Sequence, residues 1–182
     1  MARKAQLTNV ILTYIARDDS AIGVPAEELD DKYNEYLRTK DLSILRVDYD
    51  KSPCIYTLRT FSTQKHSAYV AQAIDALQSV MPNGDGASIE NVDVQTLSRV
   101  WDQYDLYIGM AIMDRIIGVS NHPMVTEVTS TGDVREVVVQ WTPGQPEPAG
   151  LIDDILSQRT LVREIFQFLV TAASLTDRQK KV

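Results

Sequence analysis

The fold class is decided by residues 54–81, which read CIYTLRTFSTQKHSAYVAQAIDALQSVM. Residues 54–61 are rich in β-branched and aromatic side chains, a composition typical of a β-strand. Ser62 then stands where a helix N-cap belongs, and apolar side chains recur at helical spacing toward Met81. A strand that runs directly into an amphipathic helix predicts a fold that combines a sheet with helices.

The rest of the chain extends this pattern in both directions. We expect strands at 10–15 and 42–47, a helix that begins near Pro25, a turn at 48–53, and a breaker at 82–86. Residues 124–130 and 134–141 are expected to form a β-hairpin that stands apart from the N-terminal strands. The predicted fold class is therefore α+β, with several short antiparallel strands, including this hairpin in the C-terminal half, packed with three main helices. Those helices are expected at 62–81, 93–118 and 151–175.

The helix expected at 93–118 is apolar on two faces. One face carries Val94, Leu97, Trp101, Tyr104, Ile108 and Ile112. The other carries Leu106, Met110, Met113 and Ile117. A helix of this kind either lies at the centre of a fold or contacts a partner.

Composition excludes several classes of function. The chain has 182 residues and a net charge of −7, which argues against an electrostatic nucleic-acid binder. Its single cysteine, Cys54, cannot form an internal disulfide and indicates a reducing compartment. Because no apolar run approaches the length of a membrane span or of a signal peptide, we expect a cytoplasmic protein with no membrane contact.

Candidate catalytic and metal-binding motifs are incomplete. Ser62 and Lys65 match the Ser-x-x-Lys pattern of penicillin-recognising enzymes, but Lys-Thr-Gly and Ser-Asp-Asn are absent, so an N-cap role for Ser62 is favoured. The two histidines, His66 and His122, have no Cys or His at metal-ligand spacing. Residues 83–86 fail the pattern of a calcium loop. We therefore expect no enzymatic activity, no cofactor and no metal.

The C-terminal quarter carries the candidate partner-binding residues. A Pro-rich segment at 143–150 is expected to act as a stiff linker between a body at 1–142 and a C-terminal helix and tail at 151–182. Six apolar side chains line one side of that helix: Ile155, Val162, Ile165, Phe166, Leu169 and Ala173. Their stripe is explained either by core packing or by a helix that binds a partner or associates with itself.

Three segments resemble the tail assembly chaperones of long-tailed bacteriophages. They are CIYTLRTFS at 54–62, DLYIGMAI at 105–112, and the helix 161–175 with its polar tail TDRQKK at 176–181. The resemblance implies a non-enzymatic protein that binds the tape-measure protein and helps to recruit tail-tube subunits in the host cytoplasm. Such chaperones are mostly helical, whereas this chain has several expected strands. The alternative is a permanent structural component of the virion, such as a neck or tail protein.

Overall fold

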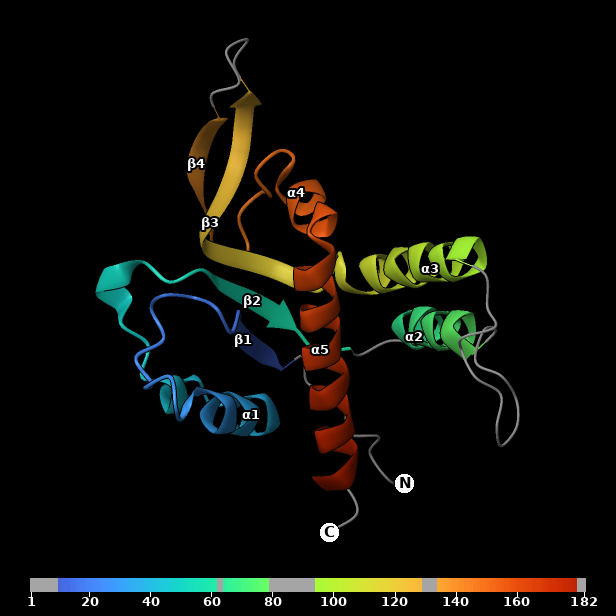
Figure 1. Cartoon of the computed structure of the whole chain (residues 1–182), viewed down its shortest axis with the longest axis horizontal. Helices are drawn as coiled ribbons and strands as arrows, with labels where there is room; N and C mark the ends of the chain where they lie inside the picture. Colours follow the sequence, from blue (N-terminus) through green and yellow to red (C-terminus); the bar gives the residue numbers. More distant parts are fainter. Residues whose placement is uncertain (1–9, 62–63, 79–93, 129–133, 180–182) are drawn as a thin grey trace, which may run out of the picture.

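A computed structural model describes residues 10–61, 64–78, 94–128 and 134–179. Its described strands form one antiparallel sheet in the order β1-β2-β3-β4, and helices pack against it, so the predicted α+β class is confirmed (Figure 1). The strands are β1 (Ile11–Ile15), β2 (Ile55–Arg59), β3 (Ile116–Val128) and β4 (Val134–Trp141). The helices are α1 (Leu29–Thr39), α2 (Gln64–Gln78), α3 (Val94–Ile112), α4 (Leu151–Ser157) and α5 (Arg159–Gln179), and two short 3₁₀ turns are η1 (Leu42–Leu45) and η2 (Tyr49–Lys51).

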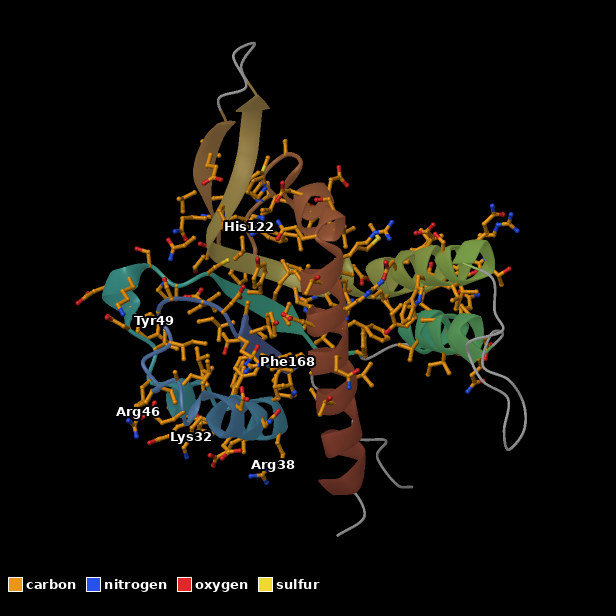
Figure 2. The ribbon with its side chains drawn as sticks, in the orientation of Figure 1. Lys32, Arg38, Arg46, Tyr49, His122 and Phe168 are labelled. Atoms are coloured by element: carbon orange, nitrogen blue, oxygen red, sulfur yellow. The ribbon has the colours of Figure 1, made fainter. Side chains whose placement is uncertain are left out.

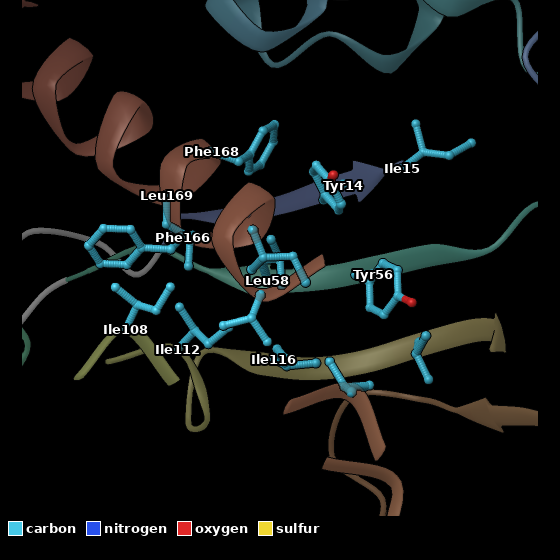
Figure 3. Packing of buried hydrophobic residues seen from close by; sticks show 14 of the residues in the cluster. Tyr14, Ile15, Tyr56, Leu58, Ile108, Ile112, Ile116, Phe166, Phe168 and Leu169 are labelled. Atoms are coloured by element: carbon cyan, nitrogen blue, oxygen red, sulfur yellow. The ribbon is translucent and has the colours of Figure 1, made fainter. Parts of the chain in front are cut away.

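The core lies where α5 crosses the sheet. Phe168 of α5 packs edge-on against Tyr14 of β1, with ring centroids 5.3 Å apart, and contacts Tyr36 of α1 at 5.7 Å. Figure 3 shows the rings of Phe168 and Tyr14 together with Leu58 of β2 and the isoleucines of α3 and β3. One buried cluster thus joins the first and last elements of the chain, because the apolar stripe of α5 covers the face of the sheet.

Helix α1 closes the outer edge of the sheet at β1. The Tyr33 hydroxyl donates to the backbone oxygen of Ile15 at 2.8 Å, and the Tyr36 hydroxyl donates to that of Thr13 at 2.8 Å while it accepts from the Ile15 amide at 3.3 Å. Backbone groups of an edge strand are thereby satisfied by side chains instead of a further strand.

The strand expected at 42–47 is wrong, because this segment forms the 3₁₀ turn η1. The Asp41 carboxylate accepts a hydrogen bond from the Ser43 amide at 3.0 Å, and Arg46 adopts a left-handed conformation with φ of 51°. Such local capping turns the chain before a strand can form. Leu45 is fully buried in the resulting loop.

The hairpin is present, but it does not stand apart from the N-terminal strands. The first part of β3 pairs with β2, from Ile55 opposite Ser120 to Leu58 opposite Ile116. The later part of β3 pairs with β4 and projects from the body (Figure 1). The register shifts between Val119 and His122, where Asn121 has a φ of 58°, so a bulge marks the point at which the hairpin leaves the sheet.

Residues 113–118 were expected to be helical and instead form a turn and the start of β3. Helix α3 ends at Ile112, and the Arg115 amide donates to the Ile112 oxygen at 2.7 Å. The Arg59 amide of β2 donates to the Arg115 oxygen at 2.8 Å. A side chain at Gly118 would lie 2.8 Å from Pro143 Cδ, so close packing of the strand requires glycine at this position.

The expected separation into a body, a linker and a C-terminal helix is also corrected. Residues 143–150 return the chain to the sheet, and the Trp141 indole donates to the Gln145 oxygen at 3.0 Å. The expected helix 151–175 is broken at Gln158, whose side-chain amide donates to Asp154 at 3.0 Å. Because α5 is the centre of the core, residues 1–142 do not contain a complete core of their own.

We predict that Leu169→Ala lowers the free energy of unfolding by about 3 kcal/mol, because it leaves a cavity at a fully buried position of α5. Gln167→Ala, at an exposed position of the same helix, is the matched control and should change it by less than about 0.5 kcal/mol. Urea unfolding followed by circular dichroism measures both. An unchanged midpoint for Leu169→Ala would contradict the central place of α5.

Candidate protein-binding surface

The second apolar face of α3 is exposed to solvent. Leu106 is 59% exposed, Met110 is 37% exposed and Met113 is 49% exposed. On the opposite side of the helix, Ile108 and Ile112 are fully buried. The two faces noted in the sequence therefore have different environments: Ile108 and Ile112 of the first join the core, and the second is partly exposed. We call Leu106, Met110 and Met113 the α3 stripe.

The α3 stripe lies on a helical arm that extends from the body. Helices α2 and α3 run side by side in Figure 1, away from the sheet and α5. The C-terminal half of α3 is anchored by Asp105, whose carboxylate accepts two hydrogen bonds from Arg163 of α5, at 2.7 and 2.8 Å. Such a bidentate pair fixes the orientation of the helix that carries the stripe.

The spacing and the residue types of the α3 stripe are suited to binding apolar segments. Its positions follow the spacing i, i+4, i+7, and Leu106 and Met110 lie on α3. Met113 directly follows the last residue of the helix, and its amide still donates to the Gly109 oxygen at 3.0 Å, so the row continues just past the helix end. Two of the three residues are methionines, whose flexible thioether chains adapt to differently shaped partners. Ile117, which the sequence analysis placed on the same face, lies in β3 and is half-buried.

The candidate residues of the C-terminal helix lie in the core. Ile155, Ile165 and Leu169 are fully buried, Val162 is 2% exposed and Phe166 is 5% exposed. The side chain of Ala173 lies outside the described part of the chain. The described members of this set pack against the sheet and α3. Their stripe is therefore explained by core packing, and the alternative of a helix displayed to a partner is wrong.

His122 links the base of the hairpin to α4 (Figure 2). Its Nδ1 lies 2.9 Å from the Tyr56 hydroxyl and its Nε2 lies 2.9 Å from the Asp154 carboxylate, and the residue is fully buried. With both ring nitrogens engaged, His122 clamps β2, β3 and α4 together.

His122 and Tyr56 form part of the wall of an open cleft of about 910 Å³, which is also lined by Cys54, Asp19 and Arg159. Burial raises the pKa of the Cys54 thiol, which disfavours the nucleophilic thiolate. The Asp19 carboxylate already accepts a hydrogen bond from the Cys54 amide at 2.8 Å. The Asp19 carboxylate therefore has a structural contact with the backbone of Cys54.

The remaining sequence motifs are settled only in part. Ser62, the side chains of Lys65 and His66, and residues 83–86 lie outside the described residues, so their predicted roles stay predictions. Among the described helices, none combines the length and the apolar character that crossing a membrane requires. Within the same residues, His, Cys, Asp and Glu side chains do not gather in a group of three that could hold a metal ion.

Comparisons with known proteins give no match to a family model, to a curated protein or to a solved structure. The α3 stripe is therefore identified only by the spacing and the exposure of its residues.

Lys40 is a second unusual feature of the described residues. Its Nζ is the one buried side-chain nitrogen or oxygen among them without a hydrogen-bond partner, and it lies 3.9 Å from the centroid of the Phe168 ring. Burial lowers the pKa of this ammonium group to about 8. The adjoining cavity between α1 and α5 measures about 400 Å³.

We predict that Lys40→Met raises the free energy of unfolding by about 1 kcal/mol at pH 7, because it removes a partly desolvated charge, even after allowance for solvent screening. The pKa of Lys40 is about 8 in the folded protein and close to the ordinary lysine value in the unfolded chain. Between these two pKa values the unfolded chain binds more protons than the folded protein, so the stability of the wild type rises with pH. The advantage of Lys40→Met should therefore shrink between pH 8 and about pH 10.5. Lys32→Met, at a lysine paired with Glu35 on the surface of α1, is the control. Equal pH dependence of the two variants in urea unfolding would contradict the burial of Lys40.

We also predict that Tyr56→Phe lowers the free energy of unfolding by about 1–2 kcal/mol, because it leaves the buried Nδ1 of His122 without its partner. Tyr49→Phe, at a side chain that is 65% exposed, should leave stability unchanged. Thermal melts of the two variants provide the comparison, and a loss of equal size in both would rule out the clamp as its cause.

Proposed function

We propose that this chain is a non-enzymatic phage tail assembly protein that binds other tail proteins, the tape-measure and tail-tube proteins, during morphogenesis in the host cytoplasm. The observation that carries the proposal is the α3 stripe: a row of one leucine and two methionines along the C-terminal half of an anchored but projecting helix and the residue that follows it. An apolar patch of this kind marks a site of protein interaction. Its adaptable side chains suit a chaperone that keeps apolar segments of a client in solution.

Two further features support a binding role without catalysis. Two titratable groups of the large cleft, His122 and Asp19, hold parts of the fold together through hydrogen bonds. The negative net charge of the chain suits a protein that keeps an apolar client soluble.

The second candidate is a permanent structural component of the virion, and β4 favours it. This strand lies at the edge of the sheet, and β3 is its only strand partner within the described residues. Val138 on β4 is 66% exposed. An open edge of this composition can accept a strand from a neighbouring subunit. Mass spectrometry of purified particles separates the two candidates, since a chaperone is absent from the particle and a structural protein is present at stoichiometric level.

We predict that the double substitution Leu106→Asp and Met110→Asp abolishes binding of the tape-measure protein when both proteins are co-expressed, because charges replace the centre of the α3 stripe. The fold should be retained, since both side chains are exposed. Ile74→Asp, at an α2 position that is 45% exposed, is the matched control and should still bind. Co-purification on a tagged chain, with circular dichroism of each variant, measures the outcome. Full binding by the double variant would remove the α3 stripe from the proposal.

A further inference from the structure

The exposed side of α3 has the spacing of a coiled-coil seam. Extended toward its N-terminus, the row of the α3 stripe includes Gln103 and Arg99, so that its members are separated by four, three, four and three residues. Both added residues are exposed. Alternation of this kind keeps one narrow face directed at a second helix. We call the five residues the α3 seam: Arg99, Gln103, Leu106, Met110 and Met113.

The two ends of the seam differ in charge, and this decides the orientation of a matching helix. Arg99 stands at the N-terminal end, and Asp114 follows Met113 at the C-terminal end with a side chain that is 48% exposed. A parallel copy of the seam would place Arg99 beside Arg99 and Asp114 beside Asp114, which is repulsive. An antiparallel copy brings each Arg99 toward the Asp114 of the other molecule. This carboxylate also binds Arg115 of its own chain, at 3.1 and 3.2 Å, so the contact with Arg99 adds to an existing ion pair.

An antiparallel copy also covers the apolar part of the seam. When the two-fold axis crosses the exposed side of α3 at the level of residue 108, Leu106 of each molecule faces Met110 of the other. In the flanking layers, Met113 of each molecule faces Gln103 of the other. A two-fold interface uses the same patch on both molecules, so the surface must complement itself. The seam meets this condition in its apolar centre and in its charged ends.

We propose that a second copy of this chain docks antiparallel on the α3 seam and covers it until a client takes its place. The inference rests on the proposed function, because the dimer and the client compete for the α3 stripe. The contact is short and contains two polar layers, so the dimer is weak and dissociates on dilution. A chaperone built in this way keeps its apolar surface out of water while it has no client.

Sedimentation velocity of the full chain over a range of concentrations tests the dimer. Wild type is expected to change from monomer to dimer as its concentration rises, and Leu106→Asp is expected to stay monomeric. Gln103→Leu is expected to tighten the dimer at least tenfold, because it converts two polar layers into apolar ones. This gain cannot arise from misfolding. Ile74→Asp, outside the seam, should dimerise as wild type does. A wild type that stays monomeric, or a Gln103→Leu variant with unchanged affinity, overturns the proposal.

Disulfide trapping tests the orientation. In a Cys54→Ser background, Leu106→Cys and Met110→Cys variants are mixed and oxidised. The antiparallel seam predicts that the mixed disulfide forms faster than either homodimeric one, because residues 106 and 110 face each other. Faster pairing of each variant with itself indicates a parallel arrangement and overturns the proposal.

Addition of purified tape-measure protein separates the inference from the proposed function. Loss of dimer as the client complex forms supports both. A dimer that forms as predicted in a chain that does not bind the tape-measure protein leaves the seam in place and removes the proposed function. A ternary complex in which the dimer persists overturns the competition between dimer and client.

Discussion

The structure depends on the contact of α5 with the sheet and α1. Phe168 reaches Tyr14 and Tyr36, residues more than a hundred positions earlier in the chain, and Glu164 of the same helix accepts a hydrogen bond from the Tyr14 hydroxyl at 2.6 Å. Burial of these aromatic groups raises the pKa of Tyr14 and Tyr36, which keeps both phenols neutral. Since the last long helix completes the core of the first strand, the chain must be whole before the body is stable.

Periodicity was sufficient to predict the elements that bury one regular face. Helix α1, strand β2 and the hairpin all follow from alternating or helical spacing of apolar residues. The predictions failed where a local hydrogen bond overrides that spacing. Asp41 and Arg46 turn an apolar stretch into η1, and the Gln158 backbone, with φ of −88° and ψ of 79°, interrupts a continuous helical stripe. Side-chain capping of this kind leaves no mark on the apolar period.

The candidate site could be predicted only as a pair of alternatives. The stripe of α5 and the outer face of α3 have the same kind of pattern in the sequence, and burial is decided by which of them meets the sheet. Phe168 lies outside the stripe expected on α5 and is 1% exposed, so the buried side of this helix is wider than its spacing suggests. A helix covered so widely belongs to the centre of the fold, whereas the outer face of α3 stays exposed.

The tyrosine hydroxyls on β1 limit how copies of this chain can aggregate. Growth of a cross-β fibre needs two open edges on every molecule, one to accept a strand and one to offer the next. Tyr33 and Tyr36 occupy backbone groups of Thr13 and Ile15, so strand addition is directed to β4. When the β4 strands of two molecules pair with each other, neither molecule has an open β4 edge left, so strand addition stops at two molecules. At the sheet edges, the exposed β-branched strand therefore offers no route to an open-ended cross-β stack.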